Sequence, residues 1–402
     1  MDTADESIND ISGQDKLYDV HRKEESIMSI SIVTVTTQAE INTFINAQWL
    51  FYNNDPNFVP PLKMDRKKLL NKKVNPFYKH AEMELYLAKR NGKTVGRIGA
   101  IVNWNHNKIH NDKVGFFGFF ECENNQETAD ALFQAAGEFL KKHSMTQMRG
   151  PVNPSMNDET GLLVEGFDSP PVVLMTYNPP YYGKLIENAG MNKVQDLLAY
   201  RLHNEEYLSD KLRRMTDIVR ERNHVTLRSV NFKNKEQFWK DVHTLKTIYN
   251  AAWQPNWGFV KMTDEEFDFL ANDLKQIADP DFTIIAEIKG QPVGFALGLP
   301  DINQSLIYNK SGGILSGIWH LLTKKKHITI TRIIVLGVLP EYQKTGVDAV
   351  MYWDLGDKAR KKGRPYGEAS WILEDNVMMN RALTTTMKGE VYKRYRLYEK
   401  TL

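Results

Sequence analysis

Residues 331–363 read TRIIVLGVLPEYQKTGVDAVMYWDLGDKARKKG, and this stretch decides the fold. Its β-branched start predicts a strand, and the apolar spacing from Val347 onward predicts an amphipathic helix. The tight polar turn between them ends in Gly346, which lets a ligand approach the backbone closely. Unpaired N–H groups and the dipole at a helix N-terminus favour a pyrophosphate. The sequence therefore predicts a phosphate cradle here, with an ordinary turn as the alternative.

The same stretch resembles the central motif of the GNAT superfamily of acyl-CoA-dependent N-acyltransferases, a strand followed by V-x-P-x-[QR]-x-x-G-x-[GA] and a helix. Val338-Leu339-Pro340 is followed two residues on by Tyr342-Gln343-Lys344-Thr345-Gly346. The sequence departs from the motif at Asp348, where the family has Gly or Ala. A carboxylate at this position would lie near the pyrophosphate unless it turns away or pairs with Lys344 or Arg364.

The composition is that of a folded protein long enough for two domains. The chain has 402 residues, of which 42% are hydrophobic and 25% are charged. A net charge of +2 gives no general attraction to nucleic acid, so no nucleic-acid partner is expected. The single cysteine, Cys122, excludes an internal disulfide, and we interpret it as a small buried apolar residue. No metal site is expected, because no histidine set has convincing metal-ligand spacing.

The N-terminus carries no recognisable targeting segment. Residues 1–28 are acidic and polar, and they lack the apolar core of a signal peptide. We expect them to be a disordered extension. No run of about 18 apolar residues follows, so no membrane-spanning helix is expected. We therefore expect a cytoplasmic protein, with contact to the inner face of the membrane as an additional possibility.

Landmarks recur along the chain at an offset of 198 residues, as from residue 91 to residue 289. The hairpin turn at 91–96 (NGKTVG) corresponds to 289–294 (KGQPVG), and Tyr200 corresponds to Tyr398. An ordered series of such matches predicts a tandem duplication.

Each half reads helix, hairpin, strand, helix, strand, helix, strand, which is the order of a GNAT domain. We expect an α/β fold of two tandem GNAT-like domains, each a mixed, mostly antiparallel sheet with helices on both faces. The expected domains are 29–202 and 223–402, with a charged, helical connector at 203–222. The first-half elements are helix 38–52, hairpin 84–103, strand 115–121, helix 126–143, strand 146–152, helix 179–189 and strand 193–202. The second-half elements are helix 235–252, hairpin 282–299, strand 328–338, helix 346–362, strand 365–372, helix 376–387 and strand 390–399.

The two halves differ at the predicted cradle. The first half has ECENNQET at 121–128, with three carboxylates and no glycine, which would repel a pyrophosphate. We therefore expect acyl-CoA in the second half, as a cosubstrate and not as a permanently bound cofactor. The first half is interpreted as a degenerate copy that shapes the acceptor side.

Acyl transfer from a thioester to an amine needs a neutral amine, a polarised carbonyl and a proton for the departing thiolate. For the base, the candidates are Glu368 and Glu121, with Glu123 or a water relay as alternatives. The resemblance implies that Tyr392 or Tyr395 is the acid, although both could be sheet aromatics. The resemblance also implies that Asn376 contacts the cofactor, although a helix N-cap is equally open. The expected cofactor-binding residues are Leu336, Gly337, Val338, Gln343, Lys344, Thr345, Gly346, Val347 and Asn376.

Two insertions, near 151–172 in the first half and near 301–330 in the second, carry further predictions. In the first half, a dense polar segment follows a strand end and could hold an acceptor head group, or it could be an ordered loop that braces the domains. Its candidate residues are Asn153, Ser155, Asn157, Asp158 and Glu159. In the second half, the apolar stretch 312–322 precedes Lys324-Lys325-Lys326, which is typical of a segment at a membrane surface. Core packing is the alternative for this stretch.

The segments NPSMNDETGLLVEGFDSPPVV, MTYNPPYY and YKRYRLYEK resemble a bacterial family of GNAT-type proteins, some of which are implicated as ceramide synthases. This resemblance implies transfer of a long-chain acyl group to the amine of a lipid-like acceptor such as a sphingoid base. An N-acetyltransferase of a small molecule or peptide is one alternative. A non-catalytic module that binds acyl-CoA is the other.

Overall fold

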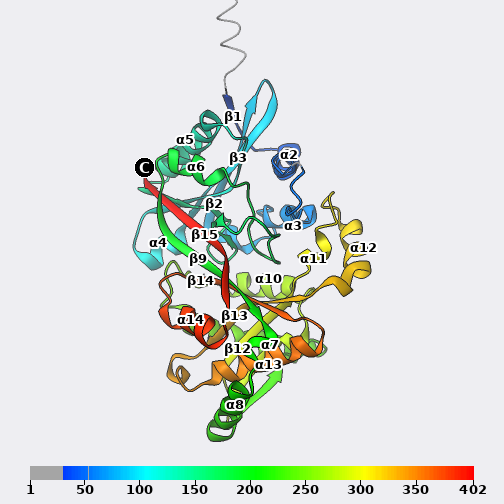
Figure 1. The fold of residues 1–402 in the computed structure, drawn as a ribbon. Helices are drawn as coiled ribbons and strands as arrows, with labels where there is room; N and C mark the ends of the chain where they lie inside the picture. Colours follow the sequence, from blue (N-terminus) through cyan, green and yellow to red (C-terminus); the bar gives the residue numbers. More distant parts are fainter. Residues whose placement is uncertain (1–29, 53) are drawn as a thin grey trace, which may run out of the picture.

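The computed structural model describes residues 30–52 and 54–402, so the extension expected at residues 1–28 lies outside the described residues. Thirteen strands of the described part form one sheet, in the order β1-β2-β3-β4-β5-β15-β9-β14-β13-β12-β11-β10, with β8 beside β15 (Figure 1). The neighbours β4/β5 and β13/β14 are parallel, and the other pairs are antiparallel. The expected α/β fold class is confirmed.

The first half, residues 30–203, contains β1 to β9 with their helices. Its elements are β1 (Ile30–Thr34), α2 (Gln38–Ala47), α3 (Lys63–Leu69), β2 (Ala81–Arg90), β3 (Lys93–Asn103), α4 (Trp104–His110), β4 (Val114–Cys122), α5 (Gln126–Lys142), β5 (Gln147–Gly150), β6 (Val152–Asn153), β7 (Glu159–Thr160), β8 (Leu162–Glu165), α6 (Tyr182–Asn188) and β9 (Asn192–His203). The connector is helical, as expected, and consists of α7 (Asn204–Tyr207) and α8 (Asp210–Asn223).

The second half, residues 225–402, repeats this order with its own additions. Its elements are β10 (Val225–Ser229), α9 (Lys235–Trp253), α10 (Asp264–Leu274), β11 (Thr283–Ile288), β12 (Gln291–Pro300), α11 (Asn303–Leu306), α12 (Ile314–Lys324), β13 (Ile330–Val338), α13 (Val347–Lys361), β14 (Tyr366–Leu373), α14 (Val377–Arg381) and β15 (Glu390–Thr401). The helix expected over 376–387 is α14 followed by a π-helical turn at Ala382–Thr386.

The two hairpins carry the marks of a duplication. The turn residues Asn91-Gly92 and Lys289-Gly290 all have positive φ, between 51° and 79°. The β2–β3 ladder shifts register between Ala88 and Lys89, and the β11–β12 ladder shifts between Ala286 and Glu287. Each bulge thus recurs at the offset that relates the sequences, which supports the interpretation of two copies.

The last strands of the two halves are exchanged. β15, from the C-terminus, pairs with β5 of the first half, whereas β9 of the first half pairs with β14 of the second. The two exchanged strands also pair with each other and run side by side through the middle of the molecule (Figure 1). Across this pair, Arg396 Nε and Nη2 donate to Asp196 at 2.8 and 3.0 Å. Each strand was expected in the sheet of its own half, and the exchange departs from that expectation.

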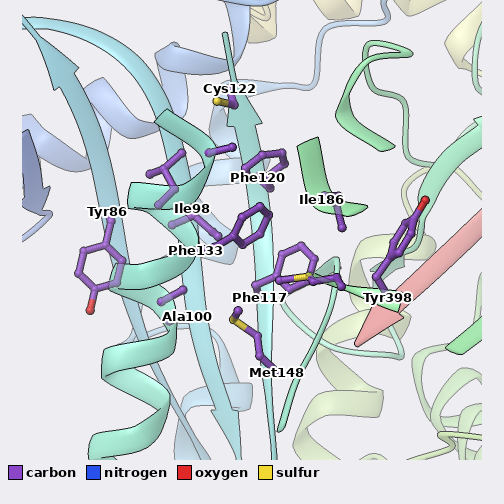
Figure 2. Packing of buried hydrophobic residues seen from close by; sticks show 14 of the residues in the cluster. Tyr86, Ile98, Ala100, Phe117, Phe120, Cys122, Phe133, Met148, Ile186 and Tyr398 are labelled. Atoms are coloured by element: carbon purple, nitrogen blue, oxygen red, sulfur yellow. The ribbon is translucent and has the colours of Figure 1, made fainter. Parts of the chain in front are cut away.

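One of the two cores of the first half lies between the sheet and α5, and the exchanged strand contributes to it. Figure 2 shows Tyr398 of β15 reaching the aromatic cluster around Phe117 and Phe133. Cys122 is fully buried in the same cluster, in the apolar role expected for it. None of the helices in residues 30–52 and 54–402 combines the length and apolar character that crossing a bilayer requires.

Candidate active site

The strands β13 and β14 are paired only at their beginnings. Their parallel ladder runs from Ile330/Tyr366 to Ile333/Ala369, and beyond it the strands separate. From Val335 to Val338, β13 keeps an antiparallel partner, β12, on its other side. Alternate backbone groups of an antiparallel strand face away from its partner, so some groups of this stretch face the gap. The cofactor-binding role expected for Leu336 to Val338 requires such free groups.

A cavity of about 290 Å³ opens where the two strands separate, and both halves of the chain line it. The strands contribute Arg332, Ile334, Val335, Ser370, Trp371 and Leu373. The helices α9 and α10 cover it with mostly apolar side chains, and the first half adds the segment around residues 156–160. Further lining residues are Phe238, Val242, Leu245, Tyr249, Trp253, Trp257, Phe259, Phe267, Leu270, Ala271 and Leu274. Residues 312–322 do not line this cavity.

Polar groups of the first-half insertion lie on the cavity wall. Asn157 and Asp158 line the cavity, and the Asn157 amide donates to the Val260 carbonyl at 2.9 Å. The Ser155 hydroxyl donates to Asp158 Oδ2 at 2.5 Å. Burial raises the pKa of Asp158 to about 7, and the neighbouring Glu159 adds to the effect. A mostly apolar cavity thus contains a carboxyl group whose pKa is near neutrality.

The other residues predicted for the acceptor are bound to the protein itself. Asn153 Oδ1 accepts from the Phe119 N–H at 2.6 Å, and Glu159 forms a 2.6 Å ion pair with Arg66. The insertion also braces the two halves, because the Val173 N–H donates to Asp301 at 2.8 Å. The bracing interpretation therefore describes part of the insertion, and the acceptor-binding role stays a prediction.

Glu368 and Tyr392, two predicted catalytic residues, lie together behind the cavity wall. The Tyr392 hydroxyl is 3.4 Å from Glu368 Oε1, and Arg332 Nε is 3.5 Å from Glu368 Oε2. Glu368 is 2% exposed, and burial raises its pKa while Arg332 opposes the rise. Arg332 also donates to the Val173 carbonyl at 2.5 Å and to the Ser370 carbonyl at 3.2 Å. Among these groups, Arg332 and Ser370 reach the cavity surface.

The structure does not bring Glu121 to this cluster. Its carboxylate accepts from the Tyr182 hydroxyl at 2.8 Å and lies 3.3 Å from Arg97 Nη2, within the first half. Burial raises the pKa of Glu121 to about 7. Glu121 does not line the cavity between the strands.

The turn of the predicted cradle has an open helix N-terminus. Gly346 precedes α13 with φ of +87°, and no side chain caps the helix. Gln343 and Lys344 are exposed, whereas Thr345 and Gly346 are half-buried. The connector helix α8 lies against the turn, because Asn223 Nδ2 donates to the Thr345 carbonyl at 3.1 Å.

Asp348 does not pair with Arg364, which lies 3.7 Å from Asp279 instead. Asn376 caps α14, because its Oδ1 accepts from the Met379 N–H at 3.1 Å. The helix-cap interpretation left open for Asn376 therefore describes its contact. Tyr395 is fully buried, as expected for a sheet aromatic.

The corresponding turn of the first half is filled by its own side chains. Asn125 caps α5, because its Oδ1 accepts from the Thr128 N–H at 3.0 Å. Arg90 forms ion pairs with Glu123 at 2.7 Å and with Glu127 at 3.3 Å. The donors and the positive charge that would attract an anion are thus already used in this copy.

Sequence reasoning missed much of the cavity. Arg332 lies within the first quoted stretch, and a charge inside a β-branched strand was a usable signal. The helices α9 and α10 gave no such signal, because an apolar face that lines a cavity has the same spacing as one that packs in a core.

Known proteins resemble this chain in sequence and in fold. No known family model matches the chain. Over 377 residues it is 34% identical to Protein YghO of Escherichia coli K12, covering 92% of this chain and 95% of that protein. Over 387 residues it is 35% identical to the bacterial ceramide synthase of Caulobacter vibrioides, covering 93% of this chain and 98% of that protein.

Solved structures show the same fold at low sequence identity. A tandem GNAT protein from the clavulanic acid biosynthesis pathway is similar with a TM-score of 0.55 and 11% identity, covering 93% of this chain and 98% of that one. A GCN5-related N-acetyltransferase from Sphaerobacter thermophilus gives a TM-score of 0.52 at 11% identity, covering 92% and 95%.

The duplicated fold and the split between its parallel strands define an N-acyltransferase of the tandem GNAT class. Within that class, the chain belongs to the family that includes the bacterial ceramide synthase of Caulobacter vibrioides.

Proposed function

We propose that the protein transfers a long-chain acyl group from acyl-CoA to the amine of a lipid-like acceptor, such as a sphingoid base. The observation that carries this proposal is the cavity of about 290 Å³ at the strand split, with its aromatic and aliphatic lining. Its size is near the lower end for sites that enclose small molecules, and its lining suits an alkyl chain better than an acetyl group alone. The relative named a ceramide synthase supports the same acceptor class.

The second half is proposed to bind the donor. The uncapped N-terminus of α13 offers backbone N–H groups and the positive end of the helix dipole to the pyrophosphate. The proposed contacts are Gln343, Lys344, Thr345, Gly346 and Val347, and Leu336, Gly337 and Val338 face the thioester. We assign no donor to the first half, because Asn125 and Arg90 already use the equivalent groups. Asn376 is proposed to order α14 and not to contact acyl-CoA directly.

The acceptor amine is proposed to meet Asp158. With a pKa of about 7, this carboxylate can take a proton from the acceptor's ammonium group near neutral pH. The neutral amine then attacks the thioester carbonyl, the C–N bond forms and the C–S bond breaks. The proton that the attacking nitrogen loses passes to the thiolate, directly or by way of a protein acid. Asn157 offers a further polar group at the same wall. In this proposal Asn153, Ser155 and Glu159 hold the segment in place.

Glu368 and Tyr392 are proposed to position Arg332 and Ser370 at the cavity wall. Tyr392 remains the candidate for protonating the thiolate, and its hydroxyl is connected to the cavity wall only through Glu368, 3.4 Å away, and Arg332. Glu121 is proposed to stabilise the first half, where Tyr182 and Arg97 hold it.

The test uses purified full-length protein with sphinganine and acyl-CoA donors of increasing chain length, and mass spectrometry of the lipid product. We expect N-acylsphinganine from long-chain donors and at least ten-fold less product from acetyl-CoA. Equal use of acetyl-CoA would contradict the long-chain proposal and favour a small-molecule acetyltransferase. Binding of acyl-CoA without turnover of any amine would favour the non-catalytic alternative.

A further inference from the structure

The helix α12 presents a large apolar face to solvent. Leu315 is 81% exposed, Leu322 74% and Trp319 65%, and Ile318 is 47% exposed beside them. The opposite face is the one that packs, because a side chain at Gly317 would meet Leu62. The helix has 11 residues and lies at the edge of the molecule beside α3 (Figure 1). Such a face is expensive to leave in water unless it serves an interaction.

Hydrogen bonds anchor the segment that precedes α12. The Lys63 N–H donates to the Gly312 carbonyl at 2.9 Å, and Trp49 Nε1 donates to the Lys310 carbonyl at 2.9 Å. Two further large apolar side chains on these neighbouring segments are exposed, Leu50 at 58% and Met64 at 52%. The apolar face therefore belongs to a regular helix whose preceding segment is hydrogen-bonded to the first half.

The charged side chains of this segment have one sign. The sequence has no Asp or Glu from residue 302 to residue 340. Lys324, Lys325 and Lys326 follow directly at the end of the helix, and the Lys324 ammonium lies 5.2 Å from the ring centre of Tyr308. An apolar face with a tryptophan, flanked by lysines without acidic partners, matches the interface of an anionic bilayer.

We propose that this surface, formed by Leu315, Ile318, Trp319 and Leu322 with Lys324 to Lys326, docks on an anionic phospholipid bilayer. The apolar side chains enter the boundary between head groups and acyl chains, and the lysines contact the phosphates. Eleven residues cannot span the hydrocarbon core, so the helix lies in the plane of the surface. This proposal stands on the surface alone and does not depend on the acceptor that the enzyme uses.

The test is vesicle flotation of the full-length protein without substrates, with phosphatidylcholine vesicles that either contain or lack phosphatidylglycerol. We expect binding to the anionic vesicles and little to the neutral ones. Leu315→Ser with Trp319→Ser is expected to weaken partitioning roughly a hundred-fold. Lys325→Glu with Lys326→Glu is expected to weaken it roughly twenty-fold or more. Tryptophan fluorescence should shift to the blue on binding, and Trp319→Phe should remove most of that shift.

Matched control variants distinguish binding through this surface from nonspecific binding to vesicles. Met215→Ser with Ile218→Ser changes two exposed apolar residues of α8, which are 43% and 63% exposed. Lys141→Glu with Lys142→Glu reverses two exposed lysines at the end of α5. Both controls should float as the wild type does.

Three outcomes would overturn the proposal. The first is flotation of the α12 variants at the wild-type level, and the second is equal binding to neutral vesicles. The third is a vesicle-free dimer that Leu315→Ser with Trp319→Ser converts to a monomer, which would make the face an interface between copies. Because flotation involves no turnover, failure here leaves the proposed acyl transfer untouched, and the reverse also holds.

Discussion

At the residue scale, the proposed chemistry depends on how few ionisable groups reach the cavity. Asp158 is half-buried and lines the cavity. Its hydroxyl partner, Ser155, satisfies one oxygen and leaves the other for an incoming ammonium group. Glu368, by contrast, is held by Arg332 and Tyr392 away from the cavity surface.

Replacing Asp158 with Asn should lower kcat/KM by roughly 10²- to 10⁴-fold, because the amide keeps the shape but cannot accept the proton. In the wild type, kcat/KM should rise with pH to a plateau above about 7, since only the ionised carboxylate acts as a base. The variant should lose that inflection. A pH–rate profile with unchanged inflection in Asp158→Asn would contradict the assignment.

The same pKa has a consequence for stability. A folded-state pKa of about 7 lies above the value of about 3.9 for an unfolded Asp, so the folded state holds the proton more tightly. The stability from this group is complete at low pH and is lost as pH rises through about 7, by at most roughly 4 kcal/mol. Denaturant unfolding of the wild type and Asp158→Asn between pH 5 and 8 should therefore show the variant gaining relative stability.

Arg332 is expected to matter for both stability and the site. Arg332→Met removes the partner of a buried carboxylate and should reduce the free energy of unfolding by about 3–5 kcal/mol. The double variant with Glu368→Gln should recover part of that loss, because the unpaired charge is then gone. Guanidinium unfolding checks both. An unchanged loss in the double variant would show that the bonds of Arg332 to Val173 and Ser370 dominate.

At the scale of the element, the N-terminus of α13 is set by a single residue. Gly346 has φ of +87°, and a side chain there would approach the Val219 side chain of α8 to 2.9 Å. The turn can therefore keep its shape only with glycine at this position. In the first half, the corresponding helix α5 begins instead with a side-chain cap, which Asn125 provides.

Gly346→Ala should raise the KM for acyl-CoA roughly ten-fold, because distortion of the turn misplaces one or two N–H donors. The KM for the acceptor should change little. Gly363→Ala is the control, since Gly363 follows the same helix with φ of +72° and open space around it. Both variants carry backbone strain. An equal effect of the two on the KM for acyl-CoA would therefore contradict a role of the turn in donor binding.

Much of the local structure was predictable from the sequence, because it is determined by short stretches of neighbouring residues. The hairpin turns, the amphipathic helix α5 and the strand-turn-helix of β13 and α13 depend on neighbouring residues, and each was predicted within a few positions. The short helices α3, α4 and α10 were missed, because their turns lie in polar or mixed segments whose helical form depends on packing. Asn157 and Asp158, named as acceptor candidates because polar residues are dense in that segment, line the cavity.

At the scale of the whole molecule, pairing partners could not be read from the sequence. The strands β9 and β15 are copies of one another, so their apolar patterns suit either sheet, and only three-dimensional packing selects the exchanged arrangement. The cavity shares this property. Its walls come from segments more than 200 residues apart, such as Asp158 and Trp371, and no local pattern joins them.

Deleting residues 390–402 should loosen the first half, although the deletion lies at the end of the second. β15 covers the edge of β5 and places Tyr398 in the first-half core. The deletion therefore removes both the strand pairing and this core side chain from the first half. Hydrogen exchange should accelerate in β4 and β5 and change least in the distant β10–β11 pair. Faster exchange confined to the second half would contradict the observed pairing.

The exchanged strands also determine how the chain could be divided. A cut between α7 and α8 would leave each fragment lacking the strand that the other carries, so neither fragment could complete its sheet alone. When the two fragments are produced together, they should instead associate and restore activity, as the parts of a split reporter do. The duplication has thus yielded two mutually dependent partners within one polypeptide.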